Sequence, residues 1–379
     1  MTEISRRKEM KIVCSQAELL KSITTASRAI PTRTTLDILE CLLIDAHADT
    51  ITITGNDLVL CIVTKTPGDI IQEGSICVNS KIFTDIIRKL PEGDICIESD
   101  ESQNVRIEGD KAKFNIAGRE TREYPSAPEV IEENGFEISN FDLKEIIRKT
   151  IFSVTDNDAN RLMSGEHFEI EGNTLTVTAL DGHRIAVVNY TLDSDYGTFD
   201  AVVIGKTLNE IAKIYAAEKE DSSEKTRVSL SDKQIKFVNT QTTIISRTVE
   251  GKYYNVKQMM SGDFDTILKI NKKDFLDSIE RASLLIRETD RRPVVIGIGE
   301  ESIELKITTT LGSMNEIVPV EMEGNEFLIG FNPKFIIEAL RVIDDEMIEV
   351  KLVSSKAPMK IEASDGSYLY LILPVNIGV

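Results

Sequence analysis

The chain has 379 residues, of which 41% are hydrophobic and 28% are charged. At about 100–200 residues per domain this length favours two to four domains, and the composition excludes wholesale disorder. The formal net charge is −19, from 63 acidic and 44 basic residues, so the chain on average repels nucleic acid. Because net charge is an average, the positions of the basic residues decide whether nucleic acid is a partner.

The first predicted helices, at residues 14–27, 138–151 and 270–283, share one pattern. Each opens on a residue that can cap a helix, has an acid three positions later as in a capping box, and then carries apolar residues at helical spacing. A separation of about 125–130 residues indicates an internal repeat. The capping pairs are Ser15 with Glu18, Ser139 with Asp142, and Asn271 with Asp274.

A second set of predicted helices lies further along each repeat. Each follows the end of a predicted strand and carries a lysine in the same place, Lys81, Lys206 or Lys334. Between the two sets, β-branched and partly alternating runs end at Gly, Asn and Asp turns, which predicts antiparallel strands. These helices are expected at 78–90, 203–215 and 331–343, and the strand runs at 50–64, 174–190 and 302–320.

The repeat predicts an α+β fold of three homologous domains, each with two helices packed on antiparallel sheet. We place the domains at residues 10–131, 135–262 and 263–379. The helices of this repeat carry many Lys and Arg residues, whereas the connecting segments carry most of the excess acid. From the charges alone, a solvated helix face screened by neighbouring acids is the favoured interpretation, and a basic binding surface is the alternative.

Apolar runs such as 41–44 are far shorter than the about 20 residues that span a bilayer, and residues 1–11 lack the apolar core of a signal peptide. We therefore expect a cytoplasmic protein. The cysteines form no CxxC pair and no two histidines have metal-ligand spacing, which favours small core residues in a reduced protein and predicts no metal and no cofactor. The cysteines are Cys14, Cys41, Cys61, Cys77 and Cys96.

The segment Asp181-Gly182-His183-Arg184 invites a catalytic interpretation, with Asp181 orienting His183 as a general base. No nucleophile motif, second histidine or carboxylate cluster accompanies it, so a tight turn is the favoured interpretation. The phosphate-binding pattern GxxxxGK[ST] is also missing from the sequence, so we expect neither nucleotide hydrolysis nor any other catalysis.

The threefold repeat and the segments 179–190, 329–340 and 368–375 resemble the bacterial DNA polymerase III beta subunit family, the sliding clamps. The resemblance runs from about Met10 to the end, which makes residues 1–9 an extension. It implies a head-to-tail homodimer that closes six domains into a ring around duplex DNA and does not read sequence. The implied role is to tether the DNA polymerase III catalytic subunit and other partners, after loading by an external clamp-loader complex.

The resemblance also implies a hydrophobic groove that takes a short partner peptide, with apolar residues flanked by a glutamine. In this sequence Tyr254 stands where many family members have proline after an aromatic residue, and the following segment, which ends at Gln258, carries no arginine, so we expect the groove entrance and the partner preference to differ. Plain core packing is the competing interpretation for Met163, Leu180 and Leu371. The implied groove residues are Met163, Leu180, Gly182, His183, Arg184, Ile185, Tyr254, Met259, Pro358, Leu371, Ile372 and Leu373.

Two further sets of residues complete the expectations. The subunit interface is expected to involve Phe114, Ile116, Leu284 and Leu285, with ordinary core packing as the alternative. The DNA-facing residues are expected to be Arg33, Lys81, Lys144, Arg148, Lys149, Lys206, Arg291, Arg292 and Lys334. Two other functions remain open: a peptide-binding scaffold or regulator of the same fold that does not load on DNA, and a small-molecule enzyme that uses His183.

Overall fold

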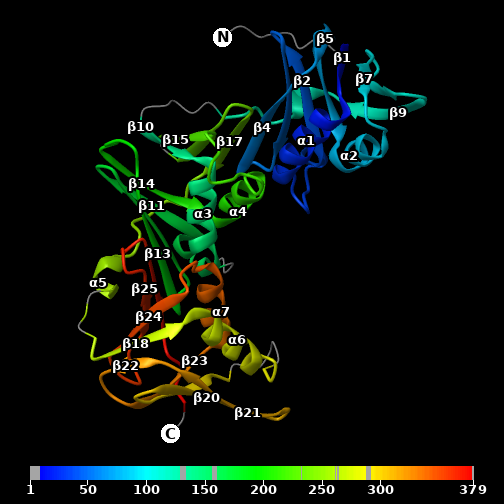
Figure 1. Cartoon of the computed structure of the whole chain (residues 1–379). Helices are drawn as coiled ribbons and strands as arrows, with labels where there is room; N and C mark the ends of the chain where they lie inside the picture. Colours follow the sequence, from blue (N-terminus) through cyan, green and yellow to red (C-terminus); the bar gives the residue numbers. More distant parts are fainter. Residues whose placement is uncertain are drawn as a thin grey trace. The chain divides into compact units, whose positions relative to one another are not determined.

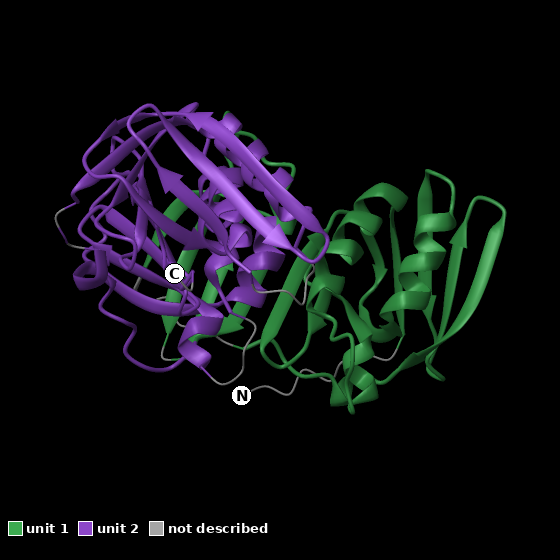
Figure 2. Cartoon of the chain, turned by 90° about the horizontal axis from the view of Figure 1, so that it is seen from below, with its two compact units in different colours: residues 1–140, 213–248 green, residues 141–212, 249–379 purple. Residues whose placement is uncertain are grey.

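The computed structural model describes residues 9–128, 134–155, 160–231, 233–260, 262, 264–286 and 292–377. The chain forms two compact units, coloured separately in Figure 2. Unit 1 comprises Met1–Asn140 and Lys213–Thr248, and unit 2 comprises Phe141–Ala212 and Val249–Val379. The middle third of the chain is therefore divided between the units.

Unit 1 is built on one antiparallel sheet of 13 strands, in the order β10-β15-β16-β17-β4-β3-β2-β6-β9-β8-β7-β1-β5. Helices α1 (Gln16–Ala26) and α2 (Ser80–Lys89), labelled in Figure 1, pack together on it. The strands are β1 (Met10–Ser15), β2 (Cys41–His47), β3 (Thr50–Asn56), β4 (Leu60–Thr66), β5 (Asp69–Gln72), β6 (Gly74–Asn79), β7 (Asp94–Ser99), β8 (Asn104–Gly109), β9 (Ala112–Arg119), β10 (Asn134–Ser139), β15 (Lys225–Ser231), β16 (Gln234–Val238) and β17 (Thr242–Arg247).

Unit 2 holds a nine-stranded sheet, β14-β11-β12-β13-β26-β25-β24-β18-β22, and a four-stranded sheet, β21-β20-β19-β23. Its strands are β11 (Gly165–Glu171), β12 (Thr174–Leu180), β13 (Arg184–Thr191), β14 (Thr198–Ile204), β18 (Thr266–Asn271), β19 (Val294–Ile298), β20 (Ser302–Thr309), β21 (Gly312–Pro319), β22 (Glu321–Glu323), β23 (Phe327–Phe331), β24 (Met347–Leu352), β25 (Met359–Glu362) and β26 (Tyr368–Ile372). Its helices are α3 (Asn140–Thr150, starting on the last residue of unit 1), α4 (Gly205–Ile214, ending in unit 1), α5 (Val256–Met260), α6 (Lys272–Ser283) and α7 (Pro333–Val342).

The six helices of the predicted repeat are all present, because their apolar stripes have a sheet to cover. In unit 1, Leu19 and Ile23 of α1 and Phe83 and Ile87 of α2 are fully buried in one core with the inner strand residues. Short 3₁₀ helices occur at Ser27–Ala29, Asp37–Glu40, Thr121–Glu123, Ile151–Ser153 and Arg161–Ser164.

The predicted capping boxes are only partly right. Asn271 caps α6 by accepting a hydrogen bond from the Asp274 amide at 3.1 Å. Ser15 stands at the N-cap of α1 but its side chain makes no capping bond. Asp142, the acid of the Ser139 pair, accepts a hydrogen bond from the Tyr190 hydroxyl of β13 at 2.6 Å.

A buried carboxyl group connects α3 to the sheet of unit 2. Glu166 on β11 is completely buried, and its Oε1 accepts a hydrogen bond from the Thr150 hydroxyl of α3 at 3.0 Å. Its Oε2 has no hydrogen-bond partner among the described residues. Burial raises the pKa of Glu166 well above its ordinary value, and the bond from Thr150 offsets only part of this shift, so folding favours the neutral form of the side chain.

We predict that Glu166→Gln stabilises unit 2 at alkaline pH. Above pH 4.5 the unfolded chain ionises Glu166 while the folded chain keeps its proton, so the wild type loses stability as pH rises and the amide does not. The thermal midpoint of the variant should exceed that of the wild type at pH 8, by about 2–4 °C for each kcal/mol recovered, and the gap should close near pH 4. Glu321→Gln changes an exposed strand residue and is the control, since its thermal midpoint should stay close to that of the wild type at both pH values. The same pH-dependent change of thermal midpoint in both variants would contradict the prediction.

Candidate functional site

The turn between β12 and β13 is fixed by its own side chain. Asp181 Oδ1 accepts hydrogen bonds from the amides of His183 at 2.9 Å and Arg184 at 3.1 Å. Gly182 has a φ of +86°, a conformation that glycine adopts without steric cost. The predicted tight turn is therefore present, and Asp181 serves the backbone at this point.

Arg184 lies behind this turn. It is only 6% exposed, and its Nε donates to Asp181 Oδ2 at 2.9 Å. Its two terminal nitrogens donate to a Glu338 carboxylate oxygen on α7 and to the Phe152 carbonyl oxygen. The guanidinium also sits 4.6 Å from the centre of the Phe335 ring. Arg184 thus ties the turn to α7 from the inside, whereas His183 is exposed and stacks on Phe335.

An apolar cluster lies next to the turn, and we call it the Leu371 cluster. Leu180, Ile185 and Leu371 project from β12, β13 and β26 on one face, and they are at most 8% exposed. Met163 and Tyr254 pack against them as partly buried residues. The remaining members are Val187, Val202, Tyr253 and Val256, with Leu162, Val249, Met260 and Leu369 at the margin.

The structure brings together only part of the predicted groove. Ile372, 1% exposed, follows Leu371 on the strand, so its side chain points to the opposite face of the sheet. Pro358 is partly buried outside the cluster. Met259 and Leu373 are 53% and 38% exposed, which is high for large apolar side chains. The sequence alone does not show which of Leu371 and Ile372 points to the cluster, because that depends on which face of the strand lies toward it.

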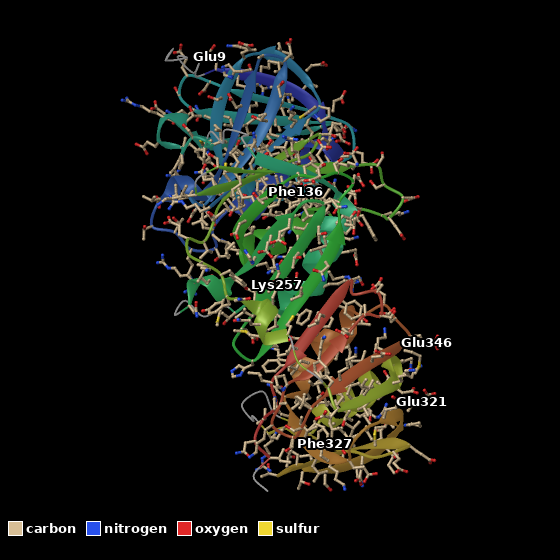
Figure 3. The ribbon with its side chains drawn as sticks, turned by 90° about the vertical axis from the view of Figure 1, so that its left-hand side faces the viewer. Glu9, Phe136, Lys257, Glu321, Phe327 and Glu346 are labelled. Carbon is tan, nitrogen blue, oxygen red and sulfur yellow. The ribbon has the colours of Figure 1, made fainter. Side chains whose placement is uncertain are left out.

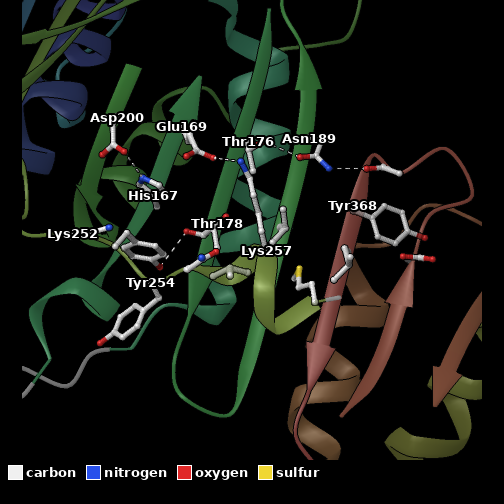
Figure 4. A pocket seen from close by; sticks show the side chains of 18 residues that line it. His167, Glu169, Thr176, Thr178, Asn189, Asp200, Lys252, Tyr254, Lys257 and Tyr368 are labelled. Atoms are coloured by element: carbon white, nitrogen blue, oxygen red, sulfur yellow. Dashed lines mark hydrogen bonds and ion pairs between the residues drawn. The ribbon is translucent and has the colours of Figure 1, made fainter. Parts of the chain in front are cut away.

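A cavity of unit 2 adjoins the Leu371 cluster, and Tyr254 is the one predicted groove residue among those that line it (Figure 4). Its volume is about 710 Å³, and it lies over the outer face of the sheet beside α5. The His167 ring stacks on Tyr253 at 4.7 Å, and Lys257 of α5 pairs with Glu169 at 3.2 Å, which raises the pKa of that lysine. Sequence reasoning missed α5 and this cavity, because His167 and Glu169 occupy ordinary outer strand positions.

The basic residues expected to face DNA differ in their surroundings. Lys81, Lys334 and Arg33 are exposed, and Lys334 lies 3.9 Å from the Glu338 carboxylate on the same helix. Arg148 and Lys149 of α3 pair with Asp344 at 3.2 and 3.1 Å, so part of their charge is compensated. Lys144 pairs with Glu145, Lys206 is exposed and has interactions of its own, Arg292 donates to the Thr308 carbonyl, and Arg291 lies outside the described residues.

Acidic side chains of unit 2 lie on its strands and loops and also on its helices. Glu321 on β22 and Glu346 before β24 are exposed (Figure 3). On the helices, Glu145 of α3 pairs with Arg148, and Asp277 of α6 pairs with Lys273. Unit 2 therefore does not show the separation of basic helices from acidic strands and loops that the sequence indicated, because acids on the same helices pair with several of the bases.

Two strands expose large apolar side chains along an open edge. β9 lies between β6 and β8 in the sheet, but its residues 112–117 pair with β8, and its pairing with β6 is confined to Gly118 and Arg119. Phe114, in the first of these stretches, is 38% exposed. β21 is an edge of the four-stranded sheet, and its Ile317 is 66% exposed. Leu284, just after α6, is 77% exposed, while Ile116 packs against the core of unit 1 and Leu285 is partly buried. The sequence analysis missed Ile317, which alternation along 312–319 could have indicated.

The described residues contain no group of three His, Cys, Asp or Glu that could hold a metal ion, and no helix among them is long and apolar enough to cross a membrane. The five cysteines are free; four are buried, as predicted, and Cys96 is partly buried. Burial raises the pKa of the Cys14 and Cys61 thiols to about 12.

Comparison with known proteins assigns the whole chain. The profiles of the DNA polymerase III beta subunit match in order: the N-terminal domain over residues 10–128, the central domain over 137–255 and the C-terminal domain over 257–376. The chain belongs to the DNA polymerase III beta subunit family. The beta sliding clamps of Halalkalibacterium halodurans and Bacillus subtilis are 34% and 32% identical to it, over 97% of this chain and 100% of each relative.

Solved structures agree with this assignment. A putative DNA polymerase III beta subunit from Eubacterium rectale superposes with a TM-score of 0.94 at 45% identity, over 98% of this chain and 100% of that one. The sliding clamp of Bacillus subtilis gives 0.93 at 30% identity, over 97% and 99%. The resemblance and the α+β fold of three clamp domains are thereby confirmed. The beta sliding clamps are non-catalytic processivity factors of DNA replication, so the enzyme interpretation of His183 is dropped.

We predict that Arg184→Met destabilises unit 2 by about 3 kcal/mol, because it leaves the partly buried carboxylates of Asp181 and Glu338 without their shared partner. Arg341→Met is the matched control, since Arg341 is exposed and pairs with Glu280 at 2.8 Å; we expect a loss of about 0.5 kcal/mol. Urea unfolding followed by fluorescence or circular dichroism measures both losses. Equal losses would show that the Arg184 interactions add nothing to an ordinary surface pair.

Proposed function

We propose that the chain closes with a second copy into a head-to-tail ring around duplex DNA and holds the replicative polymerase there. The observation that carries the proposal is the pair of open strand edges, along residues 112–117 of β9 in the N-terminal family domain and along β21 in the C-terminal one. Phe114 on the first strand and Ile317 on the second, with Leu284 after α6, give each edge an apolar anchor. Two unlike surfaces on one chain form a heterologous contact, which generates a closed ring when the rotation closes.

Binding to DNA in this proposal is electrostatic and independent of sequence. Exposed lysines such as Lys81 and Lys334 lie near the starts of α2 and α7, where they can attract phosphates without fixing a register. The ion pairs on Arg148 and Lys149 weaken their share of the attraction, so the contact is expected to be loose enough for sliding. The bacterial relatives support a cytoplasmic location, and loading would depend on a separate ATP-driven loader.

Retention on circular DNA tests the ring. After loading by a clamp loader from a bacterial relative, the protein should stay on a nicked circle through gel filtration and be lost when the circle is linearised, because a ring slides off free ends. The double variant Phe114→Ser with Leu284→Ser should sediment as a monomer and fail to be retained. Ile71→Ser, which changes another exposed strand residue, is the control and should behave as wild type.

Failure of the wild type to be retained, together with normal peptide binding, would support the scaffold function instead. A double variant that still sediments as a dimer would contradict the interface assignment.

Replacing Lys81 and Lys334 by Ala should make DNA binding less sensitive to salt. The slope of log DNA affinity against log salt concentration should fall in magnitude by up to about 0.9 for each phosphate contact removed.

We infer that the Leu371 cluster and the exposed residues beside it receive the apolar side chains of a partner peptide, such as a segment of the polymerase III catalytic subunit or of the loader. Buried Leu371 gives the groove a firm floor, while exposed Met259 on α5 gives it an adaptable rim. The Tyr254 hydroxyl at the margin accepts a hydrogen bond from the Asn160 side chain at 2.7 Å. This position replaces the proline of many family members, so the entrance has a different shape.

We predict that Met259→Ser weakens a peptide carrying a clamp-binding motif by about tenfold, because a half-exposed apolar contact worth roughly 1–2 kcal/mol is lost. Met347→Ser is a matched control, since Met347 is 54% exposed against 53% for Met259 and lies at the start of β24 outside the cluster. Isothermal titration calorimetry with each variant measures the change. Equal affinity of the two variants would remove Met259 from the groove.

A further inference from the structure

Unit 1 contains a pocket of about 190 Å³, which we call the Leu58 pocket, at the end of the β3–β4 hairpin. A cavity of about 150 Å³ is known to hold a benzene molecule, so this volume accepts one branched or aromatic side chain. The pocket is lined by Asn56, Leu58, Val59, Cys61, Pro125, Ser126, Pro128, Gln234, Ile245, Ser246 and Arg247.

The turn of this hairpin repeats the turn beside the Leu371 cluster, bond for bond. Asp57 Oδ1 accepts hydrogen bonds from the amides of Val59 at 3.0 Å and Leu60 at 2.6 Å, as Asp181 does from its own two amides. Leu58 takes the place of Gly182, and Val59 the place of exposed His183.

The strand next to the turn is placed in the same way. Cys61 of β4 lies opposite Ile245 of β17, as Ile185 of β13 lies opposite Leu371 of β26. The Arg247 amide donates to the Val59 carbonyl at 3.0 Å, and the corresponding Leu373 amide donates to His183 at 2.8 Å.

The segment that crosses the strands also corresponds. The Tyr124 hydroxyl donates to the Thr54 carbonyl at 3.0 Å, and the Tyr253 hydroxyl donates to the Thr178 carbonyl at 3.4 Å. The residue that follows is Pro125 in unit 1 and Tyr254 in unit 2. The Leu58 pocket therefore occupies, in unit 1, the place that the Leu371 cluster and its proposed peptide groove (the partner groove) occupy in unit 2.

Two features indicate that the Leu58 pocket is a binding surface. Leu58 has a φ of +72°, a conformation that costs a non-glycine residue about 1 kcal/mol or more, and it holds a large apolar side chain 46% exposed at the rim. Val59 beside it is 40% exposed. Strain that holds an apolar side chain in water is unfavourable for the isolated chain, and a ligand that covers Leu58 would offset it.

Charge identifies the chemistry of the ligand. Arg247 is exposed at the pocket, and within the part of the chain that the structure describes its guanidinium forms no ion pair. A chain with net charge −19 that leaves an arginine unpaired beside an apolar pocket presents a site for a carboxylate with an adjoining apolar side chain. The Leu371 cluster has Leu373 at the corresponding place, so the two surfaces differ in charge.

We propose that the Leu58 pocket is a second peptide-docking site, which takes a leucine-like or phenylalanine-like side chain of a partner protein and pairs Arg247 with an acidic residue next to it. The small volume allows one anchor residue, so the contact is weak by itself, with a dissociation constant of about 1 mM. A partner that is also held at the Leu371 cluster would gain avidity from this second contact, a gain that rests on the function proposed above.

Methyl NMR on the full-length chain tests this proposal. The probe is the capped peptide acetyl-Gly-Leu-Leu-Asp-Gly-amide, titrated against protein labelled at Ile, Leu and Val methyl groups. The Val59 and Ile245 methyls report on the Leu58 pocket, and the Leu371 methyls report separately on the partner groove. We expect saturable shifts of Ile245 that weaken at least about fivefold with the Asp-to-Asn peptide and in Arg247→Glu.

Leu58→Gly is a second variant. It relieves the strained backbone, so the fold is kept, and it removes the Leu58 side chain from the pocket. The peptide-induced shifts of the Ile245 methyls should be smaller in this variant as well. The proposal is overturned if Ile245 does not respond at 10 mM peptide, whether or not Leu371 responds, or if Arg247→Glu binds as tightly as wild type. It is also overturned if the Ile245 shifts follow protein concentration without peptide, because a second copy of the chain would then cover the pocket. The outcome at Leu371 is read independently, so failure of one site leaves the other intact.

Discussion

The structure depends on two antiparallel strand pairings that join one repeat to the next: β4 with β17, and β13 with β26. Each pairing continues a sheet across the point where one family domain gives way to another. The backbone bonds of these pairs fix the neighbouring hairpin turn, and the turn in turn fixes which side chains reach the surface. Both candidate binding surfaces lie beside such a pairing for this reason.

Much of the fold follows from periodicity in the sequence. The six repeat helices were predictable because their apolar stripes recur at 3.6-residue spacing, and the lysines Lys81, Lys206 and Lys334 do lie near their starts. The failures arose where the facing of a strand or the packing of a distant element decides the outcome. Ile372 points away from Leu371 because successive strand residues face opposite sides of the sheet. The short helix α5 carries no periodic signal, and its position depends on packing against strands distant in sequence.

Electrostatics shows a similar limit. The sequence identifies basic helices, but only the structure shows that Asp344 neutralises part of α3 by pairing with Arg148 and Lys149, while Lys81 stays exposed. Arg184 is a second case in which the sequence does not show the surroundings of a charge. Its motif invites a surface or catalytic role, yet its guanidinium is buried among carboxylates, a carbonyl and two rings. The sequence gives the position of each charged residue along the chain, whereas its ion-pair and hydrogen-bond partners depend on the tertiary structure.

The burial of the native thiols has a practical side. With the pKa of Cys14 and Cys61 raised to about 12, almost none of either group is thiolate at neutral pH, and thiolate is the form that reacts with maleimides and oxidants. A cysteine introduced at an exposed site would outcompete both by a wide margin. A dye can therefore be attached at one introduced cysteine without first replacing the native cysteines. The reactivity of Cys96, which is only partly buried, should be measured beforehand.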